Sequence, residues 1–301
     1  MSAPRVIGVD LGGTKILSGL VERDGTVSAP RERVTPATSQ AELLAALEDE
    51  VAALLEAEPV ALGIGIPSRL DRHTGRAVGS VNLPLADVDV GLRMRGRFGL
   101  PVGVENDANA AALAEWRLGA GRGAQDLVML TLGTGVGGGL VLGGRLYRGW
   151  AELGHMVVVA GGLPCQGSCS GRGHLEAVAS GRAADRIARE TLGNGAGAQD
   201  LIDAARAGDA RAAGALAELG SLLGAGIGSL VNVFDPDVVV VGGGFGASAG
   251  ELVLAPAREA ARAEALAPAA ERVRIVSAEL GAGAGLIGAG LVGFEALDGE
   301  R

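Results

Sequence analysis

A short polar stretch separates an apolar strand, expected over residues 101–104, from an alanine-rich helix. The stretch reads Glu105, Asn106 and Asp107. Asp107 therefore falls at a strand-to-helix turn, where a carboxylate faces the crevice at the end of a sheet and the positive end of a helix dipole. Such a group could accept a proton from a substrate hydroxyl. The alternative is that Asp107 is an ordinary N-cap of the helix, and this stretch alone favours the cap.

Two glycine-rich turns each join a pair of apolar strands. The first turn holds Gly12, Gly13, Thr14 and Lys15, and the second holds Gly133, Thr134 and Gly135. Backbone N–H groups at such turns can face a phosphate, because no Cβ atom obstructs them. Each turn alone is better explained as an ordinary hairpin. The two hairpins lie about 120 residues apart and look like copies, which predicts two related halves with a phosphate clamped between them in a cleft.

Two further strand ends carry candidate ligands of a nucleotide. Gly243 and Gly244 follow an apolar strand at residues 238–241 and could let a base or ribose lie flat on the backbone. Asp10 ends the first strand. It is placed to hold Mg²⁺ through water, because Mg²⁺ binds a few carboxylates and keeps most of its waters.

One stretch of the chain contains a candidate zinc site. Its four residues are His155, Cys165, Cys169 and His174. Two thiolates and two imidazoles are a usual ligand set of a tetrahedral structural Zn²⁺ site. The alternative is two free thiols and two unrelated histidines. The chain has only three histidines and two of them flank the cysteines, so the pattern favours zinc.

The composition limits the function classes. The 301 residues suggest two domains of ordinary size. Hydrophobic residues make up 48% and charged residues 20%, which argues against disorder. A net charge of -9 without a basic block disfavours nucleic acid or an anionic membrane as a partner. With no signal-peptide pattern and no apolar run of the roughly 18 residues that a membrane span needs, we expect a cytoplasmic protein.

The apolar periodicity predicts an order of elements that places these residues at strand ends. Strands are expected at residues 6–11, 16–22, 60–66, 101–104, in the two arms of 127–142, at 238–241 and at 274–276. Helices are expected at residues 40–57, from 107 to about 119, at 181–192, 198–207, 210–233, after a capping box at Ser248 and Glu251, and at 283–297. Residues 69–92 look irregular. The glycines within 210–233 predict close packing of that helix on a neighbour.

Five motifs, in this order along the chain, carry a resemblance to a known family. They read Asp10-Leu-Gly-Gly-Thr-Lys, Glu105-Asn-Asp-Ala-Asn-Ala-Ala, Leu132-Gly-Thr-Gly-Val-Gly-Gly-Gly, Glu152-Leu-Gly-His and Gly173-His-Leu-Glu. Together they resemble the ROK family of sugar kinases and repressors, and within it the bacterial glucokinases. The match spans nearly the whole chain, and its motifs are specific to the family but not to one sugar.

The resemblance implies an actin-like, hexokinase-type (ribonuclease H-like) duplicated α/β fold with ATP and sugar in an interdomain cleft. A small domain would comprise residues 1–117 joined by a helix at about 285–301, and a large domain with the zinc loop would comprise 118–284. By similarity, Asp107 accepts the proton of the sugar 6-hydroxyl as that oxygen attacks the γ-phosphate of ATP. The residues that would bind the sugar's other hydroxyls are Asn82, Asn106, Glu152, His155 and Glu176. The family often forms homodimers or homotetramers.

The chain departs from the family pattern in three places. The family zinc loop reads Cys-x-Cys-Gly-x-x-Gly-Cys, whereas here the first interval is two residues longer and His174 stands in place of the third cysteine. Ser68 stands where a glycine is frequent, and the tryptophan often found after the substrate Asn-Leu pair is missing. These departures leave the sugar open among glucose, N-acetylmannosamine, fructose and allose, and they leave polyphosphate open as donor.

Two non-enzymatic alternatives come from the same family. A repressor would carry an N-terminal helix-turn-helix domain, for which a strand starting near residue 5 leaves no room, and the acidic balance also disfavours it. A sugar sensor without catalysis is disfavoured by the intact Glu105-Asn106-Asp107 run. We therefore expect an ATP-dependent hexose kinase, most similar to a glucokinase.

Overall fold

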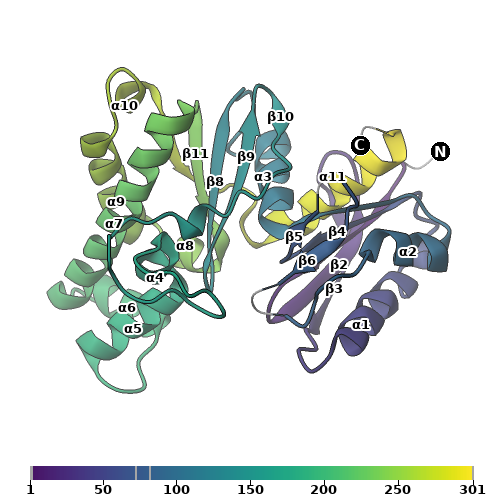
Figure 1. The fold of residues 1–301 in the computed structure, drawn as a ribbon, viewed down its shortest axis with the longest axis horizontal. Coiled ribbons are helices and arrows are strands. Elements are labelled where there is room, and N and C mark those ends of the chain that lie inside the picture. Colours follow the sequence, from purple (N-terminus) through teal and green to yellow (C-terminus); the bar gives the residue numbers. More distant parts are fainter. Residues whose placement is uncertain (1–2, 72, 81–82, 300–301) are drawn as a thin grey trace. The chain divides into compact units, whose positions relative to one another are not determined.

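The computed structural model describes residues 3–71, 73–80 and 83–299. The chain divides into two compact units, each built on its own sheet (Figure 1). Unit 1 comprises Met1–Leu118, Arg148–Trp150 and Gly283–Arg301. Unit 2 comprises Gly119–Tyr147 and Ala151–Ala282. The chain thus crosses from one unit to the other several times, and residues from distant parts of the sequence complete unit 1.

Unit 1 is built on a five-stranded sheet with the order β3-β2-β1-β4-β7. Its strands are β1 (Val6–Leu11), β2 (Lys15–Val21), β3 (Val27–Val34), β4 (Leu62–Ile66) and β7 (Val102–Asn106). β1, β2 and β3 form an antiparallel meander, while β4 is parallel to β1 and β7 is parallel to β4. Because parallel strands end at the same edge, Asp10 and Asn106 are brought to one edge of this sheet.

Helices cover both faces of this sheet. They are α1 (Gln40–Ala52), α2 (Val90–Phe98), α3 (Asp107–Leu118) and α11 (Ala284–Asp298), with short 3-10 turns η1 (Leu55–Ala57) and η3 (Gly281–Gly283). The larger core lies between the sheet and α1 and α2, where Ile7, Leu47 and Met94 are fully buried. A two-stranded sheet, β5 (Arg69–Leu70) and β6 (Ala77–Gly79), lies in the stretch that the sequence suggested was irregular.

Helix α11 lies directly on the opposite face of the sheet. Gly8, Gly63 and Gly103 are paired in register across β1, β4 and β7. A Cβ atom on each would stand 2.7, 1.7 and 2.4 Å from successive carbonyl oxygens along α11. Side chains are therefore excluded from this row, and the helix backbone rests on the strand backbones. This contact sets the position of the α11 N-terminus at the end of β1.

Unit 2 repeats the strand arrangement of unit 1. Its sheet has the order β10-β9-β8-β11-β12. The strands are β8 (Leu127–Leu132), β9 (Val136–Leu142), β10 (Arg145–Leu146), β11 (Val238–Gly242) and β12 (Arg274–Ser277). An antiparallel hairpin is again followed by two parallel strands, so the duplicated α/β fold expected from the two hairpins is confirmed.

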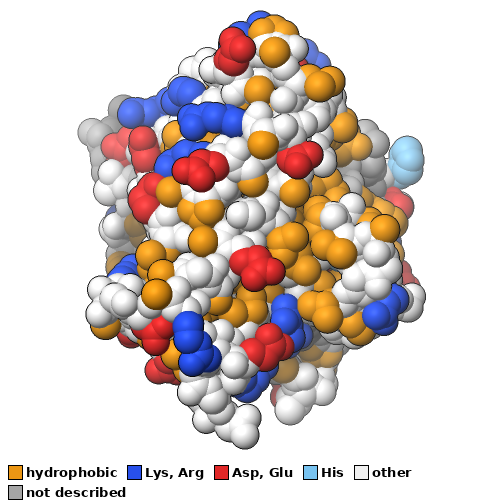
Figure 2. Space-filling model, turned by 90° about the vertical axis from the view of Figure 1, so that its left-hand side faces the viewer, with side chains coloured by type: hydrophobic (Ala, Val, Ile, Leu, Met, Phe, Trp, Pro, Cys, Tyr) orange, Lys and Arg blue, Asp and Glu red, His pale blue; other side chains and the backbone are white. Residues whose placement is uncertain are grey.

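The helices of unit 2 pack around this sheet. They are α4 (Leu175–Ala179), α5 (Gly181–Leu192), α6 (Ala198–Arg206), α7 (Ala210–Phe234), α8 (Gly243–Ala249), α9 (Glu251–Glu264) and α10 (Ala269–Arg272), with a 3-10 turn η2 (Leu153–His155). Figure 2 looks onto the side of the molecule on which these helices lie, where charged and apolar side chains are interspersed.

Helix α7 is the central helix of unit 2. Gly220, Gly224 and Gly228 face α9, where a Cβ atom on each of the first two would stand 2.4 Å from a carbonyl oxygen. The close packing that the glycines predicted is confirmed. Helix α7 has 25 residues and contains an 18-residue window with a mean hydropathy of 1.4, so it is long and apolar enough to cross a membrane by length and composition, although no apolar run of that length was expected. Because 56% of that apolar window is buried within the protein, α7 is accounted for as a core helix.

Two other expectations were wrong. The capping box expected at Ser248 and Glu251 does not form, because Gly243 and Gly244 open helix α8 directly after β11 and Ser248 lies inside that helix. Helix α2, capped by Asp89, was missed because its three arginines and two glycines obscure the apolar periodicity.

Candidate active site and metal centre

Helix α3 begins at Asp107, but its cap is the preceding residue. The Oδ1 atom of Asn106 accepts hydrogen bonds from the N–H groups of Ala108 (3.0 Å) and Asn109 (3.1 Å). Those are the groups that an N-cap satisfies. The interpretation of Asp107 as the N-cap is therefore wrong. Asp107 is the first helical residue, half-buried, and its Oδ1 atom lies 2.9 Å from the Ala108 nitrogen.

A buried carboxylate holds Asn106 in place. Oε1 of Glu105 accepts hydrogen bonds from the Asn106 backbone N–H (3.1 Å) and from Nδ2 of Asn109 (3.2 Å). The side-chain amide of Asn106 donates to the carbonyl of Ser68 at 3.4 Å. Both the backbone and the side chain of Asn106 are thus fixed, and Asp107 follows it directly.

Asp10 lies on the same face of the unit 1 sheet as Glu105, and at the same edge. It is paired in register with Gly65, which is paired with Glu105 on β7. Burial, reinforced by the negative charge of Asp107 and only partly offset by Lys15, raises the pKa of Asp10 to about 7. Two carboxylates that repel each other at a strand edge suit a divalent cation, whose charge would favour ionisation of both.

The first glycine turn is exposed at the β1–β2 tip. The Gly12 N–H donates to the Lys15 carbonyl at 2.9 Å, and Thr35 Oγ1 donates to the Gly12 carbonyl at 2.8 Å. A Cβ atom on Gly13 would meet no atom of the part of the chain that the structure describes within 4 Å, so this side of the turn has room for a ligand. Thr14 is exposed, and Lys15 forms an exposed ion pair with Glu32 at 3.1 Å.

The second glycine turn, between β8 and β9, is joined to helix α5. The N–H groups of Gly181 and Arg182 donate to the carbonyls of Gly133 (2.7 Å) and Thr134 (3.4 Å). A Cβ atom on Gly133 would likewise meet none of residues 3–71, 73–80 and 83–299 within 4 Å. The second turn is therefore held by the first residues of α5, and it has room for a ligand beside Gly133, as the first turn has beside Gly13.

The second glycine turn also contacts Glu176. A Cβ atom on Gly135 would stand 2.5 Å from Glu176 Oε2, and the Val136 N–H donates to the same oxygen at 3.4 Å. A candidate phosphate turn and a candidate sugar ligand are thus packed together within unit 2. Directly after the neighbouring strand β11, Gly243 packs on Leu132, whereas a Cβ atom on Gly244 would meet none of the described residues within 4 Å.

The four predicted metal ligands come together. One ligand atom from each of His155, Cys165, Cys169 and His174 lies within 4.8 Å of all the others. Cys169 Sγ is 3.7 Å from His174 Nδ1. Such separations are close to those between ligands of a tetrahedral zinc site, which binds sulfur at about 2.3 Å and nitrogen at about 2.0 Å. Among the described residues, the buried Nδ1 atom of His155 finds no hydrogen-bond partner. The residues therefore fit Zn²⁺.

The loop around these ligands is shaped for them. Gly171 lies beneath the His174 ring, where a Cβ atom would stand 2.3 Å from Cε1. Burial and the Glu176 carboxylate raise the pKa of the Cys165 thiol to about 12, and a bound cation would act in the opposite direction. His155 lies with its Nδ1 atom 3.5 Å from Glu152 and its Nε2 atom 3.7 Å from Glu176. The metal cluster and three candidate sugar ligands are therefore contiguous.

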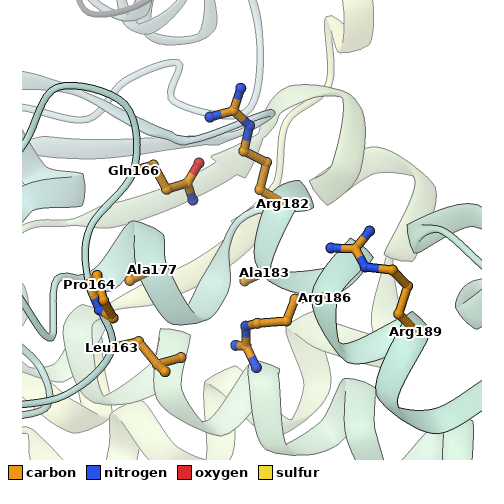
Figure 3. Close-up of a pocket in the computed structure, with 8 residues that line it drawn as sticks. All are labelled: Leu163, Pro164, Gln166, Ala177, Arg182, Ala183, Arg186 and Arg189. Atoms are coloured by element: carbon orange, nitrogen blue, oxygen red, sulfur yellow. The ribbon is translucent and has the colours of Figure 1, made fainter. Parts of the chain in front are cut away.

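The metal-ligand loop is also hydrogen-bonded to α4 and to the N-cap of α5, which no motif predicted. Gln166 Nε2 donates to the Glu176 carbonyl (2.8 Å) and to Ser180 Oγ (2.7 Å). Beside it lies a pocket of about 320 Å³ between the loop and α5 (Figure 3). Its lining residues are Leu163, Pro164, Gln166, Ala177, Arg182, Ala183, Arg186 and Arg189. A single glutamine in a loop follows no motif, so no pattern in the sequence predicts these contacts of Gln166.

The structure brings the predicted residues together in two groups. Unit 1 groups Asp10 and the first glycine turn with Asn106 and Asp107. Unit 2 groups the second glycine turn with Glu152, His155, Glu176 and the metal cluster. Asn82, the remaining predicted sugar ligand, lies outside the described residues.

Comparison with known proteins identifies the family. Residues 6–293 match the ROK family. The chain is 37% identical to a glucokinase of Streptomyces coelicolor, over 94% of this chain and 95% of that protein. It is 35% identical to a glucokinase of Thermotoga maritima, covering 98% and 99%. The structure of a ROK family glucokinase from Streptomyces griseus, in complex with glucose and AMPPNP, aligns with a TM-score of 0.86 and 36% identity, covering 97% and 99%. The chain belongs to the ROK family, and its fold is the actin-like, hexokinase-type fold of that family.

Proposed function

We propose that this protein transfers the γ-phosphate of ATP to the 6-hydroxyl of a hexose, with glucose as its substrate. The observation that carries the proposal is the position of Asp107. Its carboxylate stands at a strand end beside Asp10, and the helix it begins is already capped by Asn106. The similarity to glucokinases along nearly the whole chain supports glucose as the acceptor.

Asp107 would act as the general base. As the 6-oxygen attacks the γ-phosphorus, the O–P bond forms, the bond to the β,γ-bridging oxygen breaks, and ADP leaves. The hydroxyl proton passes to the Asp107 carboxylate. Phosphoryl transfer depends mainly on positioning and charge neutralisation, so one well-placed base beside a phosphate site is sufficient chemistry for the protein.

The sugar would be held by hydrogen-bonding side chains that the sequence motifs supply. They are Asn82, Asn106, Glu152, His155 and Glu176. A pyranose presents several hydroxyls, and amide, carboxylate and imidazole groups recognise them as donors and acceptors. In His155 one ring nitrogen would bind zinc and the other a sugar hydroxyl.

The nucleotide would lie on the glycine-rich segments. Its phosphates would face Gly12, Gly13, Thr14, Lys15, Gly133, Thr134 and Gly135, and its adenosine would lie near Gly243 and Gly244. The open space over Gly13, Gly133 and Gly244 supports this assignment. Asp10 would hold Mg²⁺ through water, and the ion would neutralise charge on the phosphates.

Zinc would be structural. His155, Cys165, Cys169 and His174 would occupy all four positions of a tetrahedral site and leave none for substrate. The ion would fix the loop that carries His155 and precedes Glu176. We further propose a cytoplasmic enzyme that forms a homodimer or homotetramer and takes sugar and ATP, not nucleic acid or membrane, as its partners.

The test is an ADP-release assay over a panel of hexoses that includes glucose, mannose, fructose, allose and N-acetylmannosamine, repeated with polyphosphate as donor and product detection. Glucose with ATP should give the highest kcat/KM. Asp107→Asn should retain glucose binding by calorimetry and lose about three orders of magnitude in kcat, as removal of a general base does. Asp24→Asn, at an exposed turn, is the matched control. No turnover with any hexose would overturn the proposal.

A further inference from the structure

Three residues of the long second half of the chain belong to unit 1. Arg148, Gly149 and Trp150 follow strand β10 of unit 2, and at Ala151 the chain returns to unit 2. We call these three residues the anchor segment. Both of its large side chains make specific contacts in unit 1, and no motif of the sequence indicated a role for either.

Arg148 bridges two carboxylates. Its Nε atom lies 3.0 Å from Glu105 Oε2, and its Nη2 atom contacts Glu295 Oε2 on α11. Only 5% of the Glu105 side chain is exposed. Within residues 3–71, 73–80 and 83–299, Arg148 is the one basic side chain paired with Glu105. A buried carboxylate is costly without such a partner, so the position of Glu105 depends on Arg148.

Trp150 provides the second attachment. Its indole N–H donates to the Leu70 carbonyl at 3.0 Å, and the Arg69 guanidinium lies 5.0 Å from the ring centroid. The ring is half-exposed, so these contacts, rather than burial, hold it. Leu70 is the last residue of β5, which begins directly after Ser68.

Both attachments converge on Asn106. Glu105, held by Arg148, accepts the Asn106 backbone N–H. Ser68, two residues before the partner of Trp150, accepts the Asn106 side-chain amide. Asn106 in turn caps α3 and immediately precedes Asp107. The anchor segment thus acts on Asn106 indirectly. Arg148 holds Glu105, and Trp150 holds the strand that follows Ser68.

We infer that Arg148 is a positioning residue for phosphoryl transfer: through Glu105 it fixes Asn106 and so aims the Asp107 carboxylate at the acceptor hydroxyl. This inference rests on the proposed function. Arg148 touches neither substrate nor base in this scheme. Its planar fork suits two carboxylates at once, which a lysine ammonium on a flexible stem does less well.

The experiment compares Arg148→Ala and Arg148→Lys with wild type. A base that is poorly aimed lowers kcat and leaves ground-state binding intact. We expect Arg148→Ala to lower kcat by about 10- to 100-fold and to leave KM for ATP within about threefold, and Arg148→Lys to recover part of the loss in kcat. KM for glucose should rise as well, because Asn106 is itself a proposed sugar ligand. Arg145→Ala, an exposed arginine on β10 in the same stretch, is the matched control and should keep wild-type kinetics.

A second readout does not depend on turnover. Hydrogen–deuterium exchange of the peptide spanning residues 104–110 should be faster in Arg148→Ala than in wild type and unchanged in Arg145→Ala. If Arg148→Ala does not fold, Glu295→Gln, which removes one of the two carboxylates, should show a smaller loss of kcat and faster exchange in the same peptide.

The outcomes separate the two proposals. An inactive wild type overturns the proposed function, whereas the exchange comparison still tests the contact. An active wild type together with normal kcat per folded molecule in Arg148→Ala overturns the positioning role. A loss of kcat equal to the loss of folded protein overturns it too, because it shows a role in stability alone.

Discussion

Gly285 lies against the carboxylate of Asp10. A Cβ atom on Gly285 would stand 2.2 Å from Asp10 Oδ2 and 3.0 Å from Oδ1. The first turn of α11 and the end of β1 therefore meet without room for a methyl group. Because Asp10 is the proposed Mg²⁺ residue, the C-terminal helix contributes to the site through the shape of its backbone.

Gly285→Ala should displace Asp10 and lower kcat/KM at least tenfold, since small misplacements of site groups cost that much or more. Alanine favours a helix over glycine by about 1 kcal/mol, so the variant should not lose stability through helix propensity. Gly283→Ala is the control, because its Cβ atom would have only Ile287 Cδ1 near it, at 3.6 Å. Steady-state kinetics across a range of Mg²⁺ concentrations measures the difference; equal kinetics in the two variants would contradict the contact.

The raised pKa of Asp10 predicts a pH-dependent stability. Folding raises the pKa from 3.8 to about 7, so the folded protein binds the proton more tightly than the unfolded chain. The contribution of Asp10 to stability is then greatest at low pH and falls as pH rises through this window. Asp10→Asn lacks this fall. In urea unfolding without Mg²⁺, the stability of the variant relative to wild type should rise between about pH 4 and about pH 7; a constant difference would count against the burial of this charge.

Alanine substitutions at Gly135 and Gly133 should have different effects on the KM values for glucose and for ATP. An alanine at 135 would press on Glu176, whereas an alanine at 133 meets only open space on the side where a phosphate would lie. Gly135→Ala should therefore raise KM for glucose about tenfold, and Gly133→Ala should raise KM for ATP more than KM for glucose. Crossed titrations of both substrates provide the measurement, and identical effects of the two substitutions would refute the assignment.

Zinc should be found at about one ion per chain by elemental analysis of purified protein. Cys169→Ser should lose most of it, and Gly171→Ala should do the same by pushing the His174 ring away. Both should lower the melting temperature and glucose affinity together, because the loop carries His155. Ser170→Ala, an exposed neighbour, should retain the ion. Full zinc content in Cys169→Ser would remove that residue from the ligand set.

Much of the fold followed from repeated local patterns. The two glycine-tipped hairpins predicted the duplication, and the glycines of residues 210–233 predicted the close contact with α9. Family membership and the fold class are confirmed. The gathering of His155 with Cys165, Cys169 and His174 also follows the prediction, because residues so close in sequence have few ways to lie apart.

What the sequence could not indicate depends on distant contacts. Asn106 and Asp107 are both good N-cap residues, so only the hydrogen bonds show which one caps α3. The pairing of Arg148 with Glu105 spans 43 residues and follows no periodicity. Gly243 and Gly244 are poor helix formers, so propensity does not predict a helix that begins there; Gly243 is held against the backbone of Leu132 on the neighbouring strand.

The position of α11 at the end of the chain determines when unit 1 can complete its folding during synthesis. The sheet of unit 1 emerges from the ribosome first, but the row of Gly8, Gly63 and Gly103 is covered only when α11 has been made, after all of unit 2. At usual translation rates this delay is of the order of ten seconds. During that interval unit 2 can fold while the glycine face of unit 1 stays bare and open to chaperones. The neighbourhood of Asp10 and Asp107 is therefore the last part of the protein to mature, and nascent chains should gain phosphotransfer activity only after α11 is released.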